Sequence, residues 1–463
     1  PITAFPSDDY FVLLSPGEGA DLLDGALDVA VGRIPVKTLQ EANQVVTKIV
    51  DYDTSPQVFG DWRNRIVFVG DDEDSGRHTK DADSIARDIA VKNPNLNINK
   101  IYVDAYKQEA SPFGVRVPAA TEALNKSMFK GTLAVTYLGH GGSKGWTQER
   151  ILKISDILSW ENNDKLPIFI TATCSFSGYD NPEFTTGGEH ILLNPKGGSI
   201  ALFTTVRAVY ASANEKLTRA STDTLFFKFN NKIPTIGEVL RISKNKVGKE
   251  SNSRKFTLLG DPSMQLALPN YNVATTTING KDLATALGDT LRALQKVVIE
   301  GEIQDDFGNL ISDFNGEVFP TIYDKTVTYQ TLGQDPGSPI INFDLQKNII
   351  FKGRASVNQG KFQFTFVVPK DINYDFGNGK ISYYASDKDM MRDAAGFYEG
   401  ITIGGTDPNA LADDLGPKVD VFMNSEDFVF GGTTGPNPTL LVKLEDDNGI
   451  NIVGNSIGHD LTG

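Results

Sequence analysis

The chain has 463 residues, a length typical of about three domains, and its 40% hydrophobic and 22% charged residues can form a sizeable core. A net charge of −15 disfavours binding to nucleic acid, because an acidic surface repels phosphates. The sequence contains no apolar run of the roughly 20 residues that a membrane-spanning helix needs. Because it begins at Pro1, without methionine, we expect it to be part of a longer protein, and its single cysteine favours an exported one.

The first part of the chain alternates apolar strand patterns with amphipathic helix patterns. This alternation predicts an α/β domain over residues 1–268, with a mostly parallel sheet covered by helices on both faces. The expected strands are 64–70, 99–106, 131–138, 166–173 and 197–206. The expected helices are 38–53, 79–91, 117–130, 211–229 and 235–247.

The pattern changes after Pro269 to short alternating strands joined by glycine-containing turns. It predicts an antiparallel β-sandwich of the immunoglobulin-like (Ig-like) type over 269–405. A further, incomplete β module is expected over 406–463, since "EIQDDFGNL" and "KLEDDNGIN" share a strand, an acidic pair and a glycine turn.

Two reactive side chains follow predicted parallel strands. His140 ends "LAVTYLGH", and Cys174, the single cysteine, ends "PIFITATC". Carboxyl ends of parallel strands meet at one edge of a sheet, where ligands bind. An imidazole beside a thiol can take its proton and generate a nucleophilic thiolate. The alternatives are a buried, inert cysteine and a histidine in a tight glycine turn.

Other groups at this edge complete a candidate catalytic site. The backbone N–H groups of Gly141 and Cys174 are the candidate oxyanion hole. In the acidic loop "GDDED", Asp72 is the first choice for orienting His140, with Asp71 and Glu73 as neighbours that could replace it. A solvated acidic turn and a cation site explain this loop equally well. No His/Cys cluster has zinc spacing, so no metal ligand is assigned and no cofactor is expected, with calcium left open.

Several residues near these strand ends are candidates for contacts with substrate. Trp146 follows the glycine loop, Tyr179 and Phe184 follow the cysteine, and Arg207 and Tyr210 follow the next strand. We assign Trp146, Tyr179 and Arg207 to substrate binding, although packing in the core or at the rim is the commoner role of an aromatic residue. His78, among polar residues, is expected at the surface.

Four segments resemble the gingipain-type cysteine peptidases of family C25: "TYLGHGG", "TATCSFSGYDNPEF", "GGSIALFTTVRAVYASAN" and "LLGDPSMQLALP". The resemblance covers about residues 1–268 and implies a caspase-like fold. It places the catalytic histidine at His140, the nucleophile at Cys174 and an acidic third member within 71–73. Ser175 stands where the family often has an acidic residue.

Other segments, among them "DVAVGRIPVKTLQEA", "GKISYYAS" and "DDNGINIVGNSIGHD", resemble the sortase branch of this family, which serves type IX secretion. The branch implies an enzyme at the outer-membrane surface of Bacteroidetes-type bacteria. It would cleave the C-terminal sorting domain from secreted cargo and transfer the cargo to an amine on anionic lipopolysaccharide, beside other type IX secretion components. The alternatives are a secreted gingipain-like endopeptidase without transferase activity, and a non-catalytic adhesin.

Overall fold

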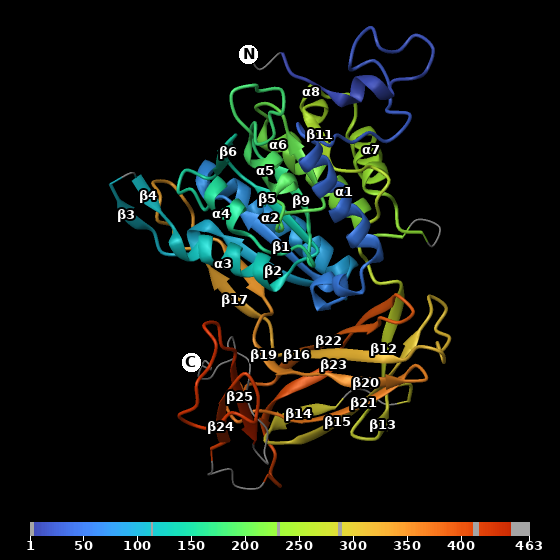
Figure 1. Cartoon of the computed structure of the whole chain (residues 1–463), viewed down its shortest axis with the longest axis vertical. Coiled ribbons are helices and arrows are strands. Elements are labelled where there is room, and N and C mark those ends of the chain that lie inside the picture. Colours follow the sequence, from blue (N-terminus) through green and yellow to red (C-terminus); the bar gives the residue numbers. More distant parts are fainter. Residues whose placement is uncertain (1–3, 113, 229–231, 286–288, 411–415, 446–463) are drawn as a thin grey trace. The chain divides into compact units, whose positions relative to one another are not determined.

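The computed structural model describes residues 4–112, 114–228, 232–285, 289–410 and 416–445. The chain divides into two compact units (Figure 1). The first unit contains residues 1–270 together with 327–345 and 388–393, and the second contains 271–326, 346–387 and 394–463. Two segments that the sequence analysis places in a β-sandwich domain over 269–405 therefore belong to the first unit.

The first unit is built on a six-stranded sheet with the order β11-β10-β9-β5-β1-β2. Neighbouring strands are parallel, except that β11 is antiparallel to β10. The strands are β1 (Arg65–Gly70), β2 (Asn97–Tyr102), β5 (Ala134–Leu138), β9 (Ile168–Ala172), β10 (Ala201–Thr205) and β11 (Phe256–Leu259). The predicted, mostly parallel α/β sheet is confirmed.

Helices cover both faces of this sheet, because its strands are apolar on both sides. In β1, Ile66 and Phe68 enter one hydrophobic cluster with α2 (Glu73–Lys92) and α6 (Ala211–Leu225). Val67 and Val69 enter a second cluster with α3 (Pro118–Lys130) and α5 (Gly187–Leu193). The helices are α1 (Leu39–Thr54), α2 (Glu73–Lys92), α3 (Pro118–Lys130), α4 (Ile154–Ser159), α5 (Gly187–Leu193), α6 (Ala211–Leu225), α7 (Ile236–Val247) and α8 (Ser251–Arg254). Among the described residues, no helix combines the length and apolar character needed to cross a membrane.

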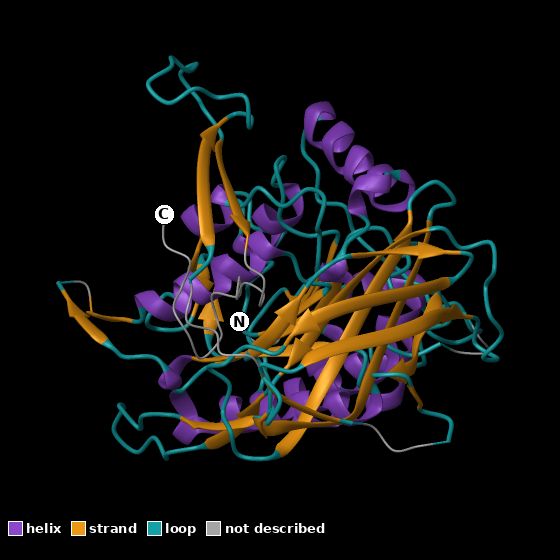
Figure 2. Cartoon of the chain, turned by 90° about the horizontal axis from the view of Figure 1, so that it is seen from below, coloured by secondary structure: helices purple, strands orange, loops and turns teal. Residues whose placement is uncertain are grey.

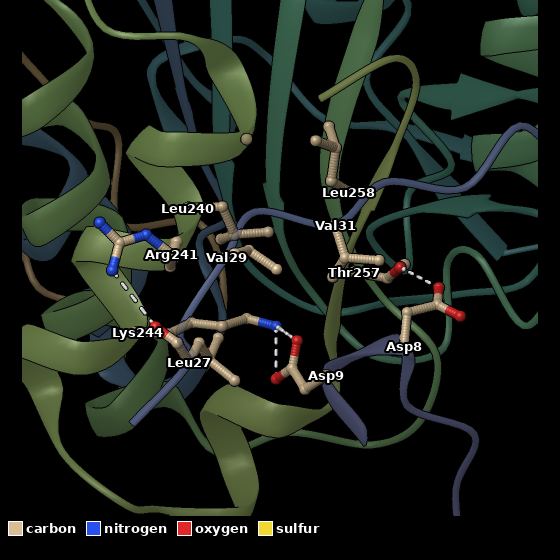
Figure 3. A pocket seen from close by; sticks show the side chains of 11 residues that line it. Asp8, Asp9, Leu27, Val29, Val31, Leu240, Arg241, Lys244, Thr257 and Leu258 are labelled. Atoms are coloured by element: carbon tan, nitrogen blue, oxygen red, sulfur yellow. Dashed lines mark hydrogen bonds and ion pairs between the residues drawn. The ribbon is translucent and has the colours of Figure 1, made fainter. Parts of the chain in front are cut away.

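The N-terminal segment is fixed to the first unit by buried charges around a small pocket (Figure 3). Lys244 of α7 binds both carboxylate oxygens of Asp9, at 2.7 and 2.8 Å. The hydroxyl of Thr257 in β11 donates to Asp8 at 3.1 Å. These side chains are satisfied by one another, so the pocket serves to attach the segment.

Smaller strands of the first unit lie in its loops: β3 (Glu109–Ser111), β4 (Gly114–Arg116), β6 (Gly141–Gly142), β7 (Gly145–Trp146), β8 (Leu152–Lys153), β17 (Val327–Gln330) and β18 (Asn342–Leu345). The antiparallel pair β17–β18 forms a hairpin, which we call the inserted hairpin (residues 327–345). It packs on the first unit through the rings of Phe343 and Tyr102, whose centroids are 4.8 Å apart.

The second unit consists of strands (Figure 2), and their buried side chains form one hydrophobic core. Their pairing follows one path, β13-β12-β15-β21-β20-β16-β22-β23-β14, and β12 also pairs with β23, which closes the path on itself. An Ig-like sandwich has two separate sheets, so the observed pairing differs from that expectation. The strands are β12 (Tyr271–Ile278), β13 (Lys281–Asp282), β14 (Thr290–Ala293), β15 (Lys296–Gln304), β16 (Gly316–Tyr323), β19 (Ile349–Lys352), β20 (Ala355–Asn358), β21 (Lys361–Val367), β22 (Gly377–Asp387) and β23 (Arg392–Thr406).

The predicted incomplete β module over 406–463 is described only in part. Strands β24 (Lys418–Met423) and β25 (Leu440–Glu445) pair as an antiparallel two-stranded sheet. Residues 446–463, which hold the whole of the motif "DDNGINIVGNSIGHD" and part of the repeated "KLEDDNGIN", lie outside the described residues.

Candidate active site

The carboxyl ends of three adjacent strands, β1, β5 and β9, carry the candidate catalytic residues. In the parallel register, Leu138 of β5 is level with Ala172 of β9. His140 and Cys174 each follow two residues later, so they leave the same edge of the sheet side by side. The acidic loop follows Gly70 of β1, which is level with Leu138. Since β2 and β5 lie on opposite sides of β1, this edge is also the switch point where open α/β sheets bind ligands.

The backbone N–H and carbonyl oxygen of His140 are both hydrogen-bonded. Its N–H donates to Asp71 Oδ2 at 2.6 Å. Its carbonyl oxygen accepts from the N–H of Thr147 at 3.0 Å and from the hydroxyl of Tyr137. A Cβ atom on Gly139 would lie 2.3 Å from the Cβ of Asp71. The glycine is therefore required for the close approach of the two loops.

The imidazole of His140 faces two carboxylates of the acidic loop. Its Nε2 is 3.1 Å from Asp74 Oδ2 and 3.6 Å from Glu73 Oε2. The ring of His78 packs edge-on against it, with centroids 5.1 Å apart. His78 is buried, which corrects the expected surface position, and burial lowers its pKa below the ordinary value.

Asp72, the first choice for orienting the histidine, does not contact the ring. Its carboxylate is 1% exposed, and neither oxygen has a hydrogen-bond partner. Asp71 holds the backbone of His140 and not its imidazole. The carboxylates beside the ring are those of Glu73 and Asp74, at the start of α2.

The acidic loop adopts an unusual backbone conformation where it meets His140. Asp74, Ser75 and Gly76 have φ of +54°, +56° and +69° at the start of α2. A left-handed conformation costs about 1–3 kcal/mol at a residue other than glycine, and such residues cluster at functional sites. The predicted helix from Thr79 therefore begins earlier in the structure, with an irregular turn that places Asp74 beside the imidazole.

Cys174 is half-buried, and its sulfur accepts the N–H of Val209 at 3.5 Å. The next residue, Ser175, has φ of +55°, and its N–H donates to the carbonyl of Arg207 at 3.2 Å. The chain therefore turns sharply directly after the thiol. Lys255 lies just before β11. Burial lowers its pKa, and the nearby Cys174 opposes this shift.

The three predicted substrate-binding residues have different surroundings. Trp146 is fully buried and stacks on Tyr137 at 4.2 Å, so it supports the residue that holds His140 and cannot line a pocket. Arg207 forms a two-point ion pair with Asp180, at 2.8 and 2.5 Å. Tyr179 lies under the guanidinium of Arg33 at 4.5 Å.

The candidate oxyanion residue Gly141 lies in close contact with the strand that carries the cysteine. A Cβ atom at this position would be 2.7 Å from Thr173 Oγ1 and 2.9 Å from the carbonyl oxygen of Gly145. Only glycine leaves the backbone this close to the residue that precedes Cys174. Its oxyanion role stays a prediction, as does that of the Cys174 N–H.

The inserted hairpin borders the acidic loop. The carboxylate of Asp104, just after β2, accepts the N–H groups of Gly333 and Gln334 at 2.6 and 3.0 Å. The hydroxyl of Ser338 donates to the carbonyl oxygen of Asp72 at 3.3 Å. A segment distant in sequence therefore forms part of the surroundings of the candidate site.

Sequence reasoning missed Asp74, Lys255 and the inserted hairpin. Asp74 belongs to the same acidic run, and only the left-handed turn brings it to the ring. Lys255 reaches this edge because β11 runs antiparallel, so its amino end lies at the carboxyl ends of the other strands. Strand direction is not visible in a single sequence, so no local signal could have revealed the lysine.

Replacing Asp74 by asparagine should lower kcat by about 3–10-fold and leave KM unchanged, because Asp74 orients the imidazole and is not expected to touch substrate. The effect should be moderate since the aspartate side chain is 51% exposed and its charge is screened by water. Steady-state kinetics on a peptide substrate measure it. Asp74→Glu should restore part of kcat, and Asp164→Asn, an exposed control, should match the wild type. Equal kcat in Asp74→Asn and the wild type would contradict an orienting role.

A thiol and an imidazole, level at the carboxyl edge of an α/β sheet beside an acidic loop, define the class of a cysteine hydrolase. The model of peptidase family C25 matches residues 1–267. The chain belongs to peptidase family C25, a family of cysteine peptidases. This confirms the resemblance found in the sequence.

Solved structures of related fold include the Arg-specific cysteine proteinase gingipain R (RgpB) of Porphyromonas gingivalis, at 15% identity, covering 86% of this chain and 79% of that chain, with a TM-score of 0.48. Dimeric latent PorU of the same organism is 23% identical over 98% of this chain and 38% of that chain, with a TM-score of 0.37. The separase–securin complex of Saccharomyces cerevisiae is 15% identical over 50% of this chain and 14% of that chain, with a TM-score of 0.34. No curated protein matches the chain. Because these TM-scores are below 0.5, the family assignment rests on the match to the family model alone.

Proposed function

We propose that this C25 peptidase acts as a sortase, in which Cys174 is the nucleophile and His140 the general base. The observation that carries the catalytic assignment is the register of β5 and β9, which brings the single thiol and the imidazole to one edge. Asp74 and Glu73 are the positioning residues for the imidazole, in place of Asp72.

In the first half of the reaction, the Cys174 sulfur attacks the carbonyl carbon of the scissile peptide bond while His140 takes the thiol proton. The N–H groups of Gly141 and Cys174 would stabilise the oxyanion. The C–N bond then breaks, the imidazolium gives its proton to the leaving amine, and the cargo remains bound as a thioester.

In the second half, a nucleophile attacks the thioester. If it is an amine, His140 takes its proton, an amide bond forms and the thiol is restored. If it is water, the product is a free carboxylate. Transfer requires a bound acceptor, because a held amine has a high effective molarity relative to water.

The transfer step is supported by the segments that resemble the sortase branch of the family, such as "DVAVGRIPVKTLQEA" and "GKISYYAS". The proposed substrates are secreted proteins with C-terminal sorting domains, and the proposed acceptor is an amine on anionic lipopolysaccharide. The enzyme would then work at the cell surface, at the outer membrane, beside other components of type IX secretion. Tyr179 and Arg207 are proposed to contact substrate.

The test is to incubate the full-length protein with a cargo carrying its sorting domain, with and without anionic lipopolysaccharide, and to measure the cargo's new C-terminus by mass spectrometry. We expect an amide-linked acceptor in its presence and no product from Cys174→Ala. A free carboxylate alone, with lipopolysaccharide in excess, would reject the sortase and leave a gingipain-like endopeptidase. No cleavage in either case would reject both.

A further inference from the structure

Two imidazoles and one carboxylate come together where the catalytic histidine meets the acidic loop. They belong to His140, in the glycine loop after β5, and to Asp74 and His78, which are separated by one helical turn in the first part of α2. One ligand atom of each lies within 4.8 Å of the others. We call this group the histidine–aspartate cluster. His140 is distant in sequence from the other two, so residue spacing alone does not reveal it.

The carboxylate of Asp74 is close to both rings of the histidine–aspartate cluster. Its Oδ2 is 3.1 Å from His140 Nε2 and 3.3 Å from His78 Nε2. In a tetrahedral zinc site with Zn–N bonds of about 2.0–2.1 Å, neighbouring ligand atoms are about 3.3 Å apart. The two distances from the carboxylate to the imidazoles therefore match those of a zinc site.

His78 brings an unsatisfied nitrogen to the cluster. The residue is 5% exposed, and among the described residues its Nε2 has no hydrogen-bond partner. The Oδ2 of Asp74 is near enough for an ion pair but is not aligned for a hydrogen bond with it. A buried polar atom without a partner is costly and calls for an explanation, such as an ion. An ion bound to this nitrogen would remove the cost.

The other side of the histidine–aspartate cluster is open to solvent. The side chains of His140 and Asp74 are 45% and 51% exposed, so an ion can enter and leave. The left-handed backbone of Asp74 and Ser75 places the carboxylate here, and such strain is typical of functional sites. Glu73 Oε2, 3.6 Å from His140 Nε2, adds a second negative charge that favours a cation.

We propose that His78, His140 and Asp74 bind a divalent transition-metal cation such as zinc, with water completing the coordination. Imidazole ligands suit zinc, whereas magnesium prefers oxygen donors alone. Two histidines, one carboxylate and a water are a known ligand set of zinc sites that keep an open position.

A bound ion would stop the proposed reaction by occupying the imidazole of His140. A neutral imidazole has one N–H group and one free lone pair. Because Nε2 faces Asp74, Nδ1 is the nitrogen left to take the thiol proton of Cys174. Zinc bound to Nε2 shifts the ring proton to Nδ1, which can then accept no other. The inhibition rests on the proposed role of His140 as the base, whereas the binding does not.

The experiment is isothermal titration calorimetry of the full chain with zinc chloride at pH 7. Excess magnesium chloride in the buffer covers sites made of oxygen ligands only. The wild type should bind zinc saturably. His78→Gln and Asp74→Asn should each weaken binding by at least about 10-fold, because each removes a ligand. Cys174→Ala should keep the wild-type affinity, as should His190→Gln, a control histidine in α5 outside the cluster.

Cobalt(II) provides a second readout that does not depend on a variant that folds. Bound to the wild type, it should show the visible absorption of a tetrahedral site, and zinc should displace it. A thiolate-to-cobalt charge-transfer band would place the ion on Cys174 and contradict the proposed ligands.

Zinc should also inhibit peptide cleavage by the wild type, at concentrations that match its Kd, and a chelator should restore the activity. The proposal is overturned if the wild type binds no zinc below millimolar concentration, if a folded His78→Gln variant keeps the wild-type affinity, or if Cys174→Ala loses the site. Binding without inhibition of an active enzyme would overturn the inhibitory role. A protein that binds zinc as expected but cleaves nothing when metal-free would support the metal site and reject the peptidase, so the two failures are distinguishable.

Discussion

Cys174→Ala is expected to reduce peptide cleavage by at least about 10⁴-fold, because alanine cannot form the thioester. His140→Gln should cause a loss of similar size, since a thiol without its base attacks poorly. The double variant should lose no more activity than the stronger single one, because residues that act as a unit are not additive. Single-turnover cleavage of a peptide substrate measures all three.

The control for this prediction is stability. Cys174 is half-buried and makes only weak hydrogen bonds through sulfur, so Cys174→Ala should unfold close to the wild-type temperature. Substantial residual cleavage by a folded Cys174→Ala variant would show that another residue carries the reaction.

Gly139→Ala should reduce kcat by about 100-fold or more and lower Tm. The new methyl group would lie 2.3 Å from the Cβ of Asp71 and 2.4 Å from the hydroxyl of Tyr137, the two residues that hold the backbone of His140. Something must move, and a displacement of about 1 Å at a catalytic group can cost 100-fold in rate.

The same glycine loop offers a matched control. Gly142 has no atom within 4 Å of its added Cβ and does not need a positive φ. Gly142→Ala should therefore keep wild-type kcat and Tm. Equal kinetics in the Gly139 and Gly142 variants would mean that the packing around His140 does not set its catalytic position.

The fold of the first unit and the placement of His140 and Cys174 follow from local sequence patterns. An apolar run buried on both faces indicates a parallel strand, and the residue after it lies at the binding edge. The start of α1 also follows from local sequence. As the sequence predicts, Thr38 caps the helix, and its hydroxyl accepts the N–H of Glu41. Such features depend on residues close in sequence.

The remaining features of the site depend on contacts that sequence spacing does not encode. Trp146 has the position of a pocket residue along the chain, yet it is stacked under Tyr137 in the core. The contact of Asp74 with the imidazole depends on three consecutive left-handed residues. The inserted hairpin has an ordinary strand pattern, and only the tertiary structure shows that it joins the first unit. Two of these differences arise from long-range packing, and the third from a local backbone conformation that the sequence pattern does not reveal.

The activation of Cys174 by His140 is measured most directly by the rate of thiol alkylation as a function of pH. The chain has one cysteine, so iodoacetamide labelling followed by intact mass reports on this residue alone. At pH 6, an ordinary thiol with a pKa near 8.5 is less than about 1% thiolate. We predict that the wild type reacts at pH 6 at least about 10-fold faster than the His140→Gln variant. Identical rates in both proteins, rising together only near pH 8.5, would contradict the assignment of His140 and Cys174 as a catalytic pair.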